Sequence, residues 1–418
     1  MEKRIMSLTG NEATAWAVRM ARIRVALSFP MGPNAEVTET LQQFVDSGEM
    51  TDLKVIYGDN EKASSSIQIG VGRLGVRSLL CINSEGILWA ASEIHYAACS
   101  RLPLMIVCPS RALEPPTTVY CDHDDFMTQR DSGWLMFYCE SPQDVFDTIL
   151  QVYKIIERED VMLPAIVGYD GWETSHASSR VAMPEDPSEI GAFLPEPHFV
   201  GPEKDYLAVD WKDRFSKRRM QEGFGGSDFM DIRYLQKKAE GQSVTAIEEV
   251  GREYAERFGS QHVGLLETHR CEDAEIILVS IGIIHPITRI VVDAFRNQGV
   301  KVGCVKLRVF RPFPSQALCE ALGSAKLIVT LDRNSVSALY SEVGSALYND
   351  QSVRRKGPGP LLMGKVIGIG GASITVELIS SIIEEGVKVM EKGIVDTPLE
   401  WTPLRGIDFN PTRDIIAE

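Results

Sequence analysis

The sequence predicts an α/β fold of two successive units, and three observations support this prediction. With 418 residues, the chain is too long for one ordinary hydrophobic core but suits two α/β domains. Short apolar segments alternate with segments of helical spacing, as in parallel sheets that helices cover on both faces. This alternation stops at Asp170-Gly171-Trp172 and resumes near Tyr234. We therefore expect one domain over residues 1–240, with an extended arm at about 175–230, and a second over 241–418.

The first unit starts with a helix, because Thr9 and Glu12 have the spacing of a capping box and apolar residues continue a helical pattern to Ala21. We expect strands at residues 25–28, 53–57, 78–82, 103–108 and 163–168. Helices are expected at residues 36–45, 63–74, 86–100 and 141–157. In such sheets the ligand crevice lies at the carboxyl ends of the strands, so we expect the loops that follow them to converge on one site.

The arm and the second unit follow. Residues 175–226 are rich in Pro, Gly, Asp and Glu without periodicity but keep aromatic residues, so we expect an extended arm packed on a partner. A helix is predicted at 234–258. The second α/β unit is predicted to start at Ile276, with strands at 276–280, 300–307 and 327–331 and helices at 287–297 and 315–322. The run Gly368-Ile369-Gly370-Gly371 does not fit the dinucleotide fingerprint, which favours a tight turn beside the sheet.

Charge and composition exclude several classes of function. The net charge of −15, from 58 acidic and 43 basic residues, argues against nucleic acid or an anionic membrane as the partner. No apolar run reaches the length of a membrane span, and the N-terminus lacks a signal-peptide pattern, so we expect a cytoplasmic protein. The eight cysteines are spread singly, without a Cys-x-x-Cys pair, which indicates reduced thiols and no iron–sulfur ligand set.

Residues 58–72 form the stretch with the clearest chemical content. An apolar strand leads into it, Asp59 or Asn60 can cap a helix, and Glu61 falls in the first helical turn. The small residues that follow suggest close packing against neighbouring backbone. The helix N-terminus favours a charged carboxylate and burial favours a neutral one, so the local sequence leaves the protonation state of Glu61 open. Taken alone, this stretch favours the alternative that Glu61 is a capping acid of a surface helix.

Four further stretches accompany this one in a fixed order. They are Ser28-Phe29-Pro30-Met31-Gly32-Pro33, Ser84-Glu85-Gly86, Pro109-Ser110-Arg111-Ala112-Leu113 and Asp122-His123-Asp124-Asp125. Together the five resemble the α subunit of the thiamine-diphosphate-dependent 2-oxoacid:ferredoxin oxidoreductase family, which includes the pyruvate, 2-oxoisovalerate, oxalate and phenylglyoxylate enzymes. The resemblance covers nearly the whole chain. It implies a pyrimidine-binding thiamine-diphosphate domain with a parallel sheet, followed by a transketolase C-terminal-like α/β domain.

The resemblance also implies roles for individual residues. Glu61 matches the glutamate that shares a proton with N1′ of the aminopyrimidine, an acid that this cofactor needs. Arg111 matches the arginine whose fork holds the substrate carboxylate; the alternative is a surface salt-bridge arginine. His123 matches a loop near the substrate, where it could orient the site or merely cap a helix. The other residues assigned to the cofactor are Pro30, Gly32 and Ser84.

Two positions depart from the family pattern. Glu85 replaces the usual glutamine of a Ser-Gln-Gly turn, which puts an amide contact there in doubt. Gly32 stands where pyruvate enzymes typically carry a threonine beside the reacting centre. Either the backbone requires glycine at this position, or the pocket is widened for a bulky or aromatic 2-oxoacid such as phenylglyoxylate.

The chain lacks the Gly-Asp-Gly motif with a downstream Asn that usually clamps metal and pyrophosphate, and we predict no metal ligand in it. The diphosphate and Mg²⁺ are therefore expected on a β subunit. The [4Fe-4S] clusters are expected on partner subunits, namely a γ subunit and a ferredoxin-like cluster subunit. Coenzyme A is the expected co-substrate, and ferredoxin or an NAD-reducing subunit the expected acceptor.

The sequence thus predicts the α subunit of an enzyme that oxidatively decarboxylates a 2-oxoacid to its acyl-CoA. The alternatives are a pyruvate:ferredoxin oxidoreductase α subunit and a non-catalytic scaffold of the same fold. Gly32 and Glu85 keep the scaffold alternative open, whereas Glu61 together with Arg111 argues against it.

Overall fold

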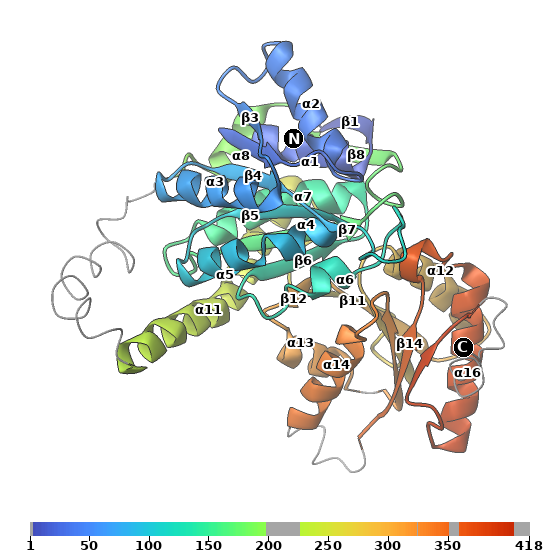
Figure 1. Cartoon of the computed structure of the whole chain (residues 1–418). Coiled ribbons are helices and arrows are strands. Elements are labelled where there is room, and N and C mark those ends of the chain that lie inside the picture. Colours follow the sequence, from blue (N-terminus) through green and yellow to red (C-terminus); the bar gives the residue numbers. More distant parts are fainter. Residues whose placement is uncertain (1–2, 198–225, 324, 351–358, 405–418) are drawn as a thin grey trace, which may run out of the picture.

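The computed structural model describes residues 3–197, 226–323, 325–350 and 359–404. Its strands form two large sheets and one short antiparallel pair. The first unit comprises the described residues between 3 and 258, and the second unit those from 266 to 404 (Figure 1). The α/β fold class predicted from the sequence is confirmed.

The first sheet has seven strands in the order β12-β6-β7-β5-β4-β2-β3. They are β2 (Val25–Ser28), β3 (Lys54–Tyr57), β4 (Ser78–Cys81), β5 (Met105–Ser110), β6 (Leu135–Cys139), β7 (Ala165–Asp170) and β12 (Val309–Arg311). All neighbouring strands are parallel except β12, which comes from the second unit and runs antiparallel to β6. The predicted parallel sheet is confirmed, and its outermost strand β12 is supplied by the other half of the chain.

Helices cover both faces of this sheet, because successive strand residues point to opposite sides, as Ala26 and Leu27 do. One face is covered by α1 (Gly10–Met20), α2 (Ala35–Asp46) and α7 (Pro142–Ile156), the other by α3 (Glu61–Arg73), α4 (Ser84–Trp89), α5 (Ala91–Cys99) and α6 (Asp124–Met127). The predicted capping box of α1 is present, since the Thr9 hydroxyl accepts from Glu12 N–H and the Glu12 carboxylate accepts from Thr9 N–H.

The segment expected to be an irregular arm is partly regular. It contains β8 (Ser179–Pro184) and α8 (Pro187–Phe193), and β8 pairs antiparallel with β1 (Lys3–Leu8). Phe193 is buried against Tyr254 and Phe258. The expectation of irregular structure is therefore wrong for residues 179–193, because β8 finds its partner far away in the sequence. The rest of the predicted arm, residues 198–225, lies outside the described residues.

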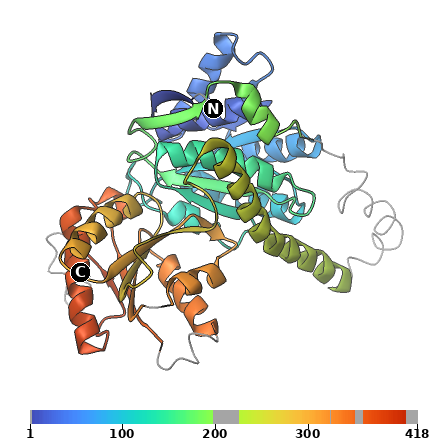
Figure 2. The same cartoon turned by 180° about the vertical axis from the view of Figure 1, so that it is seen from behind.

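The helix α11 (Gly226–Phe258) connects the two units and packs against α7 through the buried side chains of Ala246, Val250 and Tyr254 (Figure 2). The predicted boundary between the two domains, at residues 240 and 241, falls inside this continuous helix. The boundary itself stays a prediction. Within the described ranges, none of the helices combines the length and the apolar character needed to cross a bilayer.

The second sheet has the order β15-β14-β13-β10-β11-β9, and only β9 is antiparallel to its neighbour. Its strands are β9 (Leu266–His269), β10 (Ile276–Ser280), β11 (Val302–Leu307), β13 (Leu327–Asp332), β14 (Leu361–Val366) and β15 (Leu399–Trp401). Its helices are α12 (Ile284–Asn297), α13 (Ser315–Ala321), α14 (Ala338–Asn349) and α16 (Val376–Lys392).

One hydrophobic cluster joins the two sheets. It contains Leu27 and Tyr138 from the first sheet as well as Val279 and Leu307 from the second. The glycines after β14 form the expected tight turn, with φ values of +72°, +58° and +81° at Gly368, Gly370 and Gly371. This turn lies against the first unit, because Gly371 N–H donates to the Cys121 carbonyl oxygen at 2.8 Å.

Candidate functional site

The predicted site residues follow four neighbouring strands of the first sheet. Pro30 follows β2, Glu61 follows β3, Ser84 follows β4 and Arg111 follows β5. These strands are adjacent and parallel in the order β5-β4-β2-β3, so their carboxyl ends lie along one edge of the sheet. The structure therefore brings the four loops together at the edge where ligands of such sheets bind.

Glu61 is the first residue of α3 and is 4% exposed. The cap of this helix is Asn60, whose side chain accepts from Ala63 N–H at 2.9 Å. Gly86 lies directly against the carboxyl group, since a Cβ at this position would come within 2.6 Å of Glu61 Cγ and Oε1. Glu61 is therefore a buried acid packed against the backbone of Gly86, and the alternative of a capping acid on a surface helix does not apply.

Ser84 opens α4 in a left-handed conformation with φ of +49°, which is uncommon for a residue other than glycine. Its hydroxyl lies 2.6 Å from Glu85 Oε2 and 2.8 Å from the Ala112 carbonyl oxygen. The other Glu85 oxygen accepts from the backbone N–H of Glu114. Burial opposes the ionisation of Glu85, but these two hydrogen bonds lower the pKa of its carboxyl group. Glu85 is thus a fixed carboxylate that ties two site loops together.

Arg111 is 12% exposed at its side chain and makes three contacts within the site. Its Nε donates to the Thr118 carbonyl oxygen at 2.9 Å, and its Nη1 donates to the Gly32 carbonyl oxygen at 3.3 Å. Its Nη2 pairs with the Glu114 carboxylate. The guanidinium is therefore bound to an internal carboxylate, and a substrate carboxylate that binds here has to displace Glu114.

Gly32 lies next to this arginine. A Cβ built on it would meet no atom of the described residues within 4 Å, and its φ is outside the left-handed region. Gly32 is exposed in this chain, and neither crowding nor a left-handed backbone accounts for the glycine, so the widened pocket stays a prediction.

Asp125 is a site residue that sequence reasoning did not single out. Its fully buried Oδ2 accepts from the backbone N–H groups of Ser84 at 2.9 Å and Arg111 at 3.0 Å. Burial raises the pKa of this carboxyl group, and the backbone hydrogen bonds partly offset the effect. Three acids occur between residues 122 and 125, and the sequence carries no signal that Asp125 is the one that points inward.

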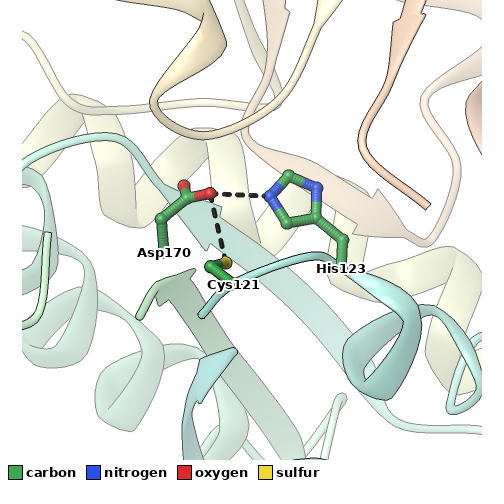
Figure 3. A group of neighbouring side chains, drawn as sticks. All are labelled: Cys121, His123 and Asp170. Atoms are coloured by element: carbon green, nitrogen blue, oxygen red, sulfur yellow. Dashed lines mark hydrogen bonds and ion pairs between the residues drawn. The ribbon is translucent and has the colours of Figure 1, made fainter. Parts of the chain in front are cut away.

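His123 is fully buried, and its Nε2 lies 2.9 Å from Asp170 Oδ1 (Figure 3). It precedes α6, but its side chain does not cap that helix. The structure thus places the imidazole in an internal contact, and its predicted role toward the substrate stays a prediction.

Cys121, His123 and Asp170 carry ligand atoms within 4.8 Å of one another, a spacing that could suit a metal ion (Figure 3). However, Arg333 Nη1 already lies 2.6 Å from the same Asp170 oxygen, and burial raises the pKa of the Cys121 thiol well above its usual value. A protonated thiol and a bound guanidinium do not favour a cation. All eight cysteines lie in the described residues, and none of them forms a disulfide there.

Comparisons with known proteins agree with this arrangement. A family profile described as pyruvate flavodoxin/ferredoxin oxidoreductase, thiamine diphosphate-binding, matches residues 16–254, and one described as pyruvate:ferredoxin oxidoreductase core domain II matches residues 274–379. The chain is 33% identical to the ketoisovalerate oxidoreductase subunit VorA of Pyrococcus horikoshii over 404 residues, which cover 95% of this chain and 98% of the relative. It is 33% identical to the pyruvate synthase subunit PorA of Methanosarcina barkeri over 398 residues, which cover 94% and 95%.

The fold is also found among solved structures. A 2-oxoglutarate:ferredoxin oxidoreductase from Magnetococcus marinus, solved with 2-oxoglutarate, coenzyme A and succinyl-CoA, matches with a TM-score of 0.67 at 14% identity. The match covers 92% of this chain and 65% of that one, so the chain spans about two thirds of the solved protein. A split-gene transketolase matches with a TM-score of 0.53 at 11% identity. By its two family profiles and its nearly full-length relatives, the chain belongs to the α subunits of the 2-oxoacid:ferredoxin oxidoreductase family.

Proposed function

We propose that this chain supplies the pyrimidine-side acid and the substrate arginine of a thiamine-diphosphate site in a multi-subunit enzyme. The enzyme oxidatively decarboxylates a 2-oxoacid to its acyl-CoA and passes the electrons to iron–sulfur clusters on other subunits. The observation that carries this proposal is the pair of Glu61 and Arg111, one a buried acid and the other a mostly buried arginine, on the loops that follow β3 and β5 along one edge of the sheet. A non-catalytic scaffold would have no need for both.

The residues present fit the pyrimidine end of the cofactor. Glu61 is an almost fully buried acid, and Gly86 lets the backbone pack directly against its carboxyl group, where a Cβ would collide with it. When bound, thiamine diphosphate supplies the electron sink for decarboxylation. Glu61 would hold and return a proton at its carboxyl oxygen, and the loop that contains Pro30 and Gly32 would help to hold the pyrimidine ring. Arg111 orients the substrate carboxylate once Glu114 has moved away.

The partners follow from what this chain lacks. We assign the diphosphate and Mg²⁺ to a β subunit, since the sequence has no matching clamp, and the [4Fe-4S] clusters to a γ subunit and a ferredoxin-like subunit. Ferredoxin or an NAD-reducing subunit accepts the electrons, and coenzyme A accepts the acyl group. The names of the relatives support this assignment, because VorA and PorA are described as subunits.

The open space beside Gly32 favours a substrate larger than pyruvate. The substrates named for the relatives are ketoisovalerate and pyruvate, so a branched or aromatic 2-oxoacid, including phenylglyoxylate, is our first choice and pyruvate is the alternative.

The test is to purify the complex from its natural host through a tag on this chain. Mass spectrometry is expected to identify a thiamine-diphosphate-binding β chain and a cluster-bearing chain. The purified complex should reduce methyl viologen only when a 2-oxoacid and coenzyme A are both present. Pyruvate, 2-oxoisovalerate and phenylglyoxylate are compared as substrates. A complex that contains these partners but oxidises none of the three would contradict the proposal.

A further inference from the structure

Residues 120–125, here called the bridging loop, connect the site with the second unit. On the site side, Asp125 accepts from the backbone of Ser84 and Arg111. On the other side, His123 N–H donates to the Arg333 carbonyl oxygen at 2.7 Å, and Asp124 Oδ1 accepts from Ser335 N–H at 2.8 Å. The loop that sets the backbone of two site residues is therefore itself held by the second unit.

Arg333 is the centre of this attachment and is fully buried. It directly follows β13, and its guanidinium reaches three groups. Nη1 donates to Asp170 Oδ1 at 2.6 Å, Nη2 to Glu173 Oε1 at 2.6 Å and Nε to the Gly368 carbonyl oxygen at 2.9 Å. Asp170 is the last residue of β7 in the first unit and Glu173 follows it, whereas Gly368 follows β14 in the second unit, so the arginine binds the carboxyl ends of both sheets together.

Asp170 connects Arg333 with the bridging loop. Its Oδ1 contacts both Arg333 and the His123 imidazole, and its Oδ2 accepts from Ile283 N–H at 3.0 Å. The neighbouring Gly282, with φ of +61°, allows this approach, since a Cβ there would lie 2.5 Å from Oδ2. The His123 side chain is consequently fixed from the second unit through one carboxylate, two residues before Asp125 in the chain.

We propose that Arg333 is a positioning residue for substrate binding. Arg333 fixes the bridging loop in two ways, by the ion pair of its side chain with Asp170 and by its backbone carbonyl oxygen. The loop in turn fixes the backbone of Arg111 through the carboxylate of Asp125. The inference rests on the proposed function, in which Arg111 orients the substrate carboxylate. Because an error of about 1 Å in such a contact can cost roughly a hundredfold in rate, a loosened loop affects substrate capture even without contact to the substrate.

The test compares Arg333→Gln with Arg308→Gln in the assembled complex. Arg308 is also buried and also joins the units, but it does so elsewhere, donating to Thr148 Oγ1 at 2.7 Å and to the Gly264 carbonyl oxygen at 2.8 Å. KM and kcat are measured with 2-oxoisovalerate and pyruvate, and KM is the readout that decides. We expect Arg333→Gln to raise KM by about tenfold or more and Arg308→Gln by less than about twofold.

A second variant keeps the test decisive if Arg333→Gln does not assemble. Asp124→Ala removes the exposed contact to Ser335 without leaving a buried charge, and we expect it to raise KM by a few-fold. The proposal is overturned if Arg333→Gln and Arg308→Gln change KM equally, or, where Arg333→Gln fails to assemble, if Asp124→Ala leaves KM at the wild-type value. Failure of the proposed function would appear separately, as a wild-type complex without 2-oxoacid oxidation.

Discussion

Glu61 owes its position to two other residues, since Asn60 caps the helix and the missing side chain of Gly86 lets the backbone lie against the carboxyl group. The sequence shows which residues stand at these two positions but not the contacts that they make. The motif order was enough to predict the acid and the arginine, because each follows an apolar strand. Glu114 and Asp125 were not predicted, since their roles depend on where the loops fold back rather than on local pattern.

Glu61→Gln is expected to leave the complex assembled but to lower turnover by roughly 10²- to 10⁴-fold, because an amide cannot share an acidic proton with the pyrimidine ring. The measurement is the rate of C2–H exchange of bound thiamine diphosphate by NMR. Size-exclusion chromatography of the variant controls for assembly. Exchange at the wild-type rate would remove Glu61 from the mechanism.

Gly32→Thr tests the widened pocket. The structure has room for the side chain, so the fold should tolerate it. In the pocket, steric exclusion should lower kcat/KM for phenylglyoxylate by about tenfold or more while changing the value for pyruvate much less. The ratio of the two values is the readout, because general damage affects both substrates alike. An unchanged ratio, or a wild-type preference for pyruvate, would show that the glycine does not set substrate size.

Among the secondary-structure elements, α3 links local stability to the site most directly, because its first residue is Glu61. Asn60→Ala removes the side-chain cap, and we expect it to lower the free energy of unfolding by about 1 kcal/mol. The check is the midpoint of urea unfolding. Asn60→Ser keeps a capping oxygen and should lie close to wild type, so equal midpoints for the alanine and serine variants would contradict the role of the cap.

Most of the buried parallel strands of the first sheet were predicted, because burial on both faces leaves a continuous apolar run such as that of β5, but β6 was missed although it is equally buried. The strand β1 was missed because most of its residues are exposed, and β8 because its only partner is β1. The three-residue β12 gave no signal either, since its pairing with β6 depends on a distant part of the chain.

At the scale of the whole molecule, the two units also meet in a buried group of charges. Lys306 on β11 lies 2.7 Å from Asp144 Oδ2 on α7 and 3.3 Å from Glu267 Oε1 on β9. His262 Nδ1 lies 3.6 Å from the same Glu267 oxygen. Burial opposes the ionisation of Glu267, but His262 and Lys306 outweigh it and hold the pKa at about 2.

His262 makes the contact between the units sensitive to pH. Burial lowers its pKa, but the carboxylates of Asp144 and Glu267 outweigh this effect and raise the pKa above its usual value. Its stabilising contribution is therefore complete below a pH of about 6.5 and is lost as the pH rises through the raised value. We expect the Tm of wild type to exceed that of His262→Gln by about 2 °C at pH 6, and less at pH 9.

Calorimetry of the purified complex across this pH range gives the two melting temperatures. Glu267→Gln serves as the control, because it removes one of the carboxylates that raise the pKa of His262. In that background the difference should disappear at a lower pH than in wild type. A difference between wild type and His262→Gln that stays constant from pH 6 to pH 9 would show that the histidine does not titrate there.

The pairing of β12 with β6 also has a consequence during synthesis of the protein. Until Arg311 has left the ribosome, β6 is an open edge with unpaired backbone N–H and C=O groups, although every other strand of its sheet has already been made. The nascent first unit is thus exposed to pairing with other chains for the time in which α11 and the first strands of the second unit are translated. Cellular yield of this subunit should then depend on chaperones that shield one particular edge, rather than on the stability of the finished fold.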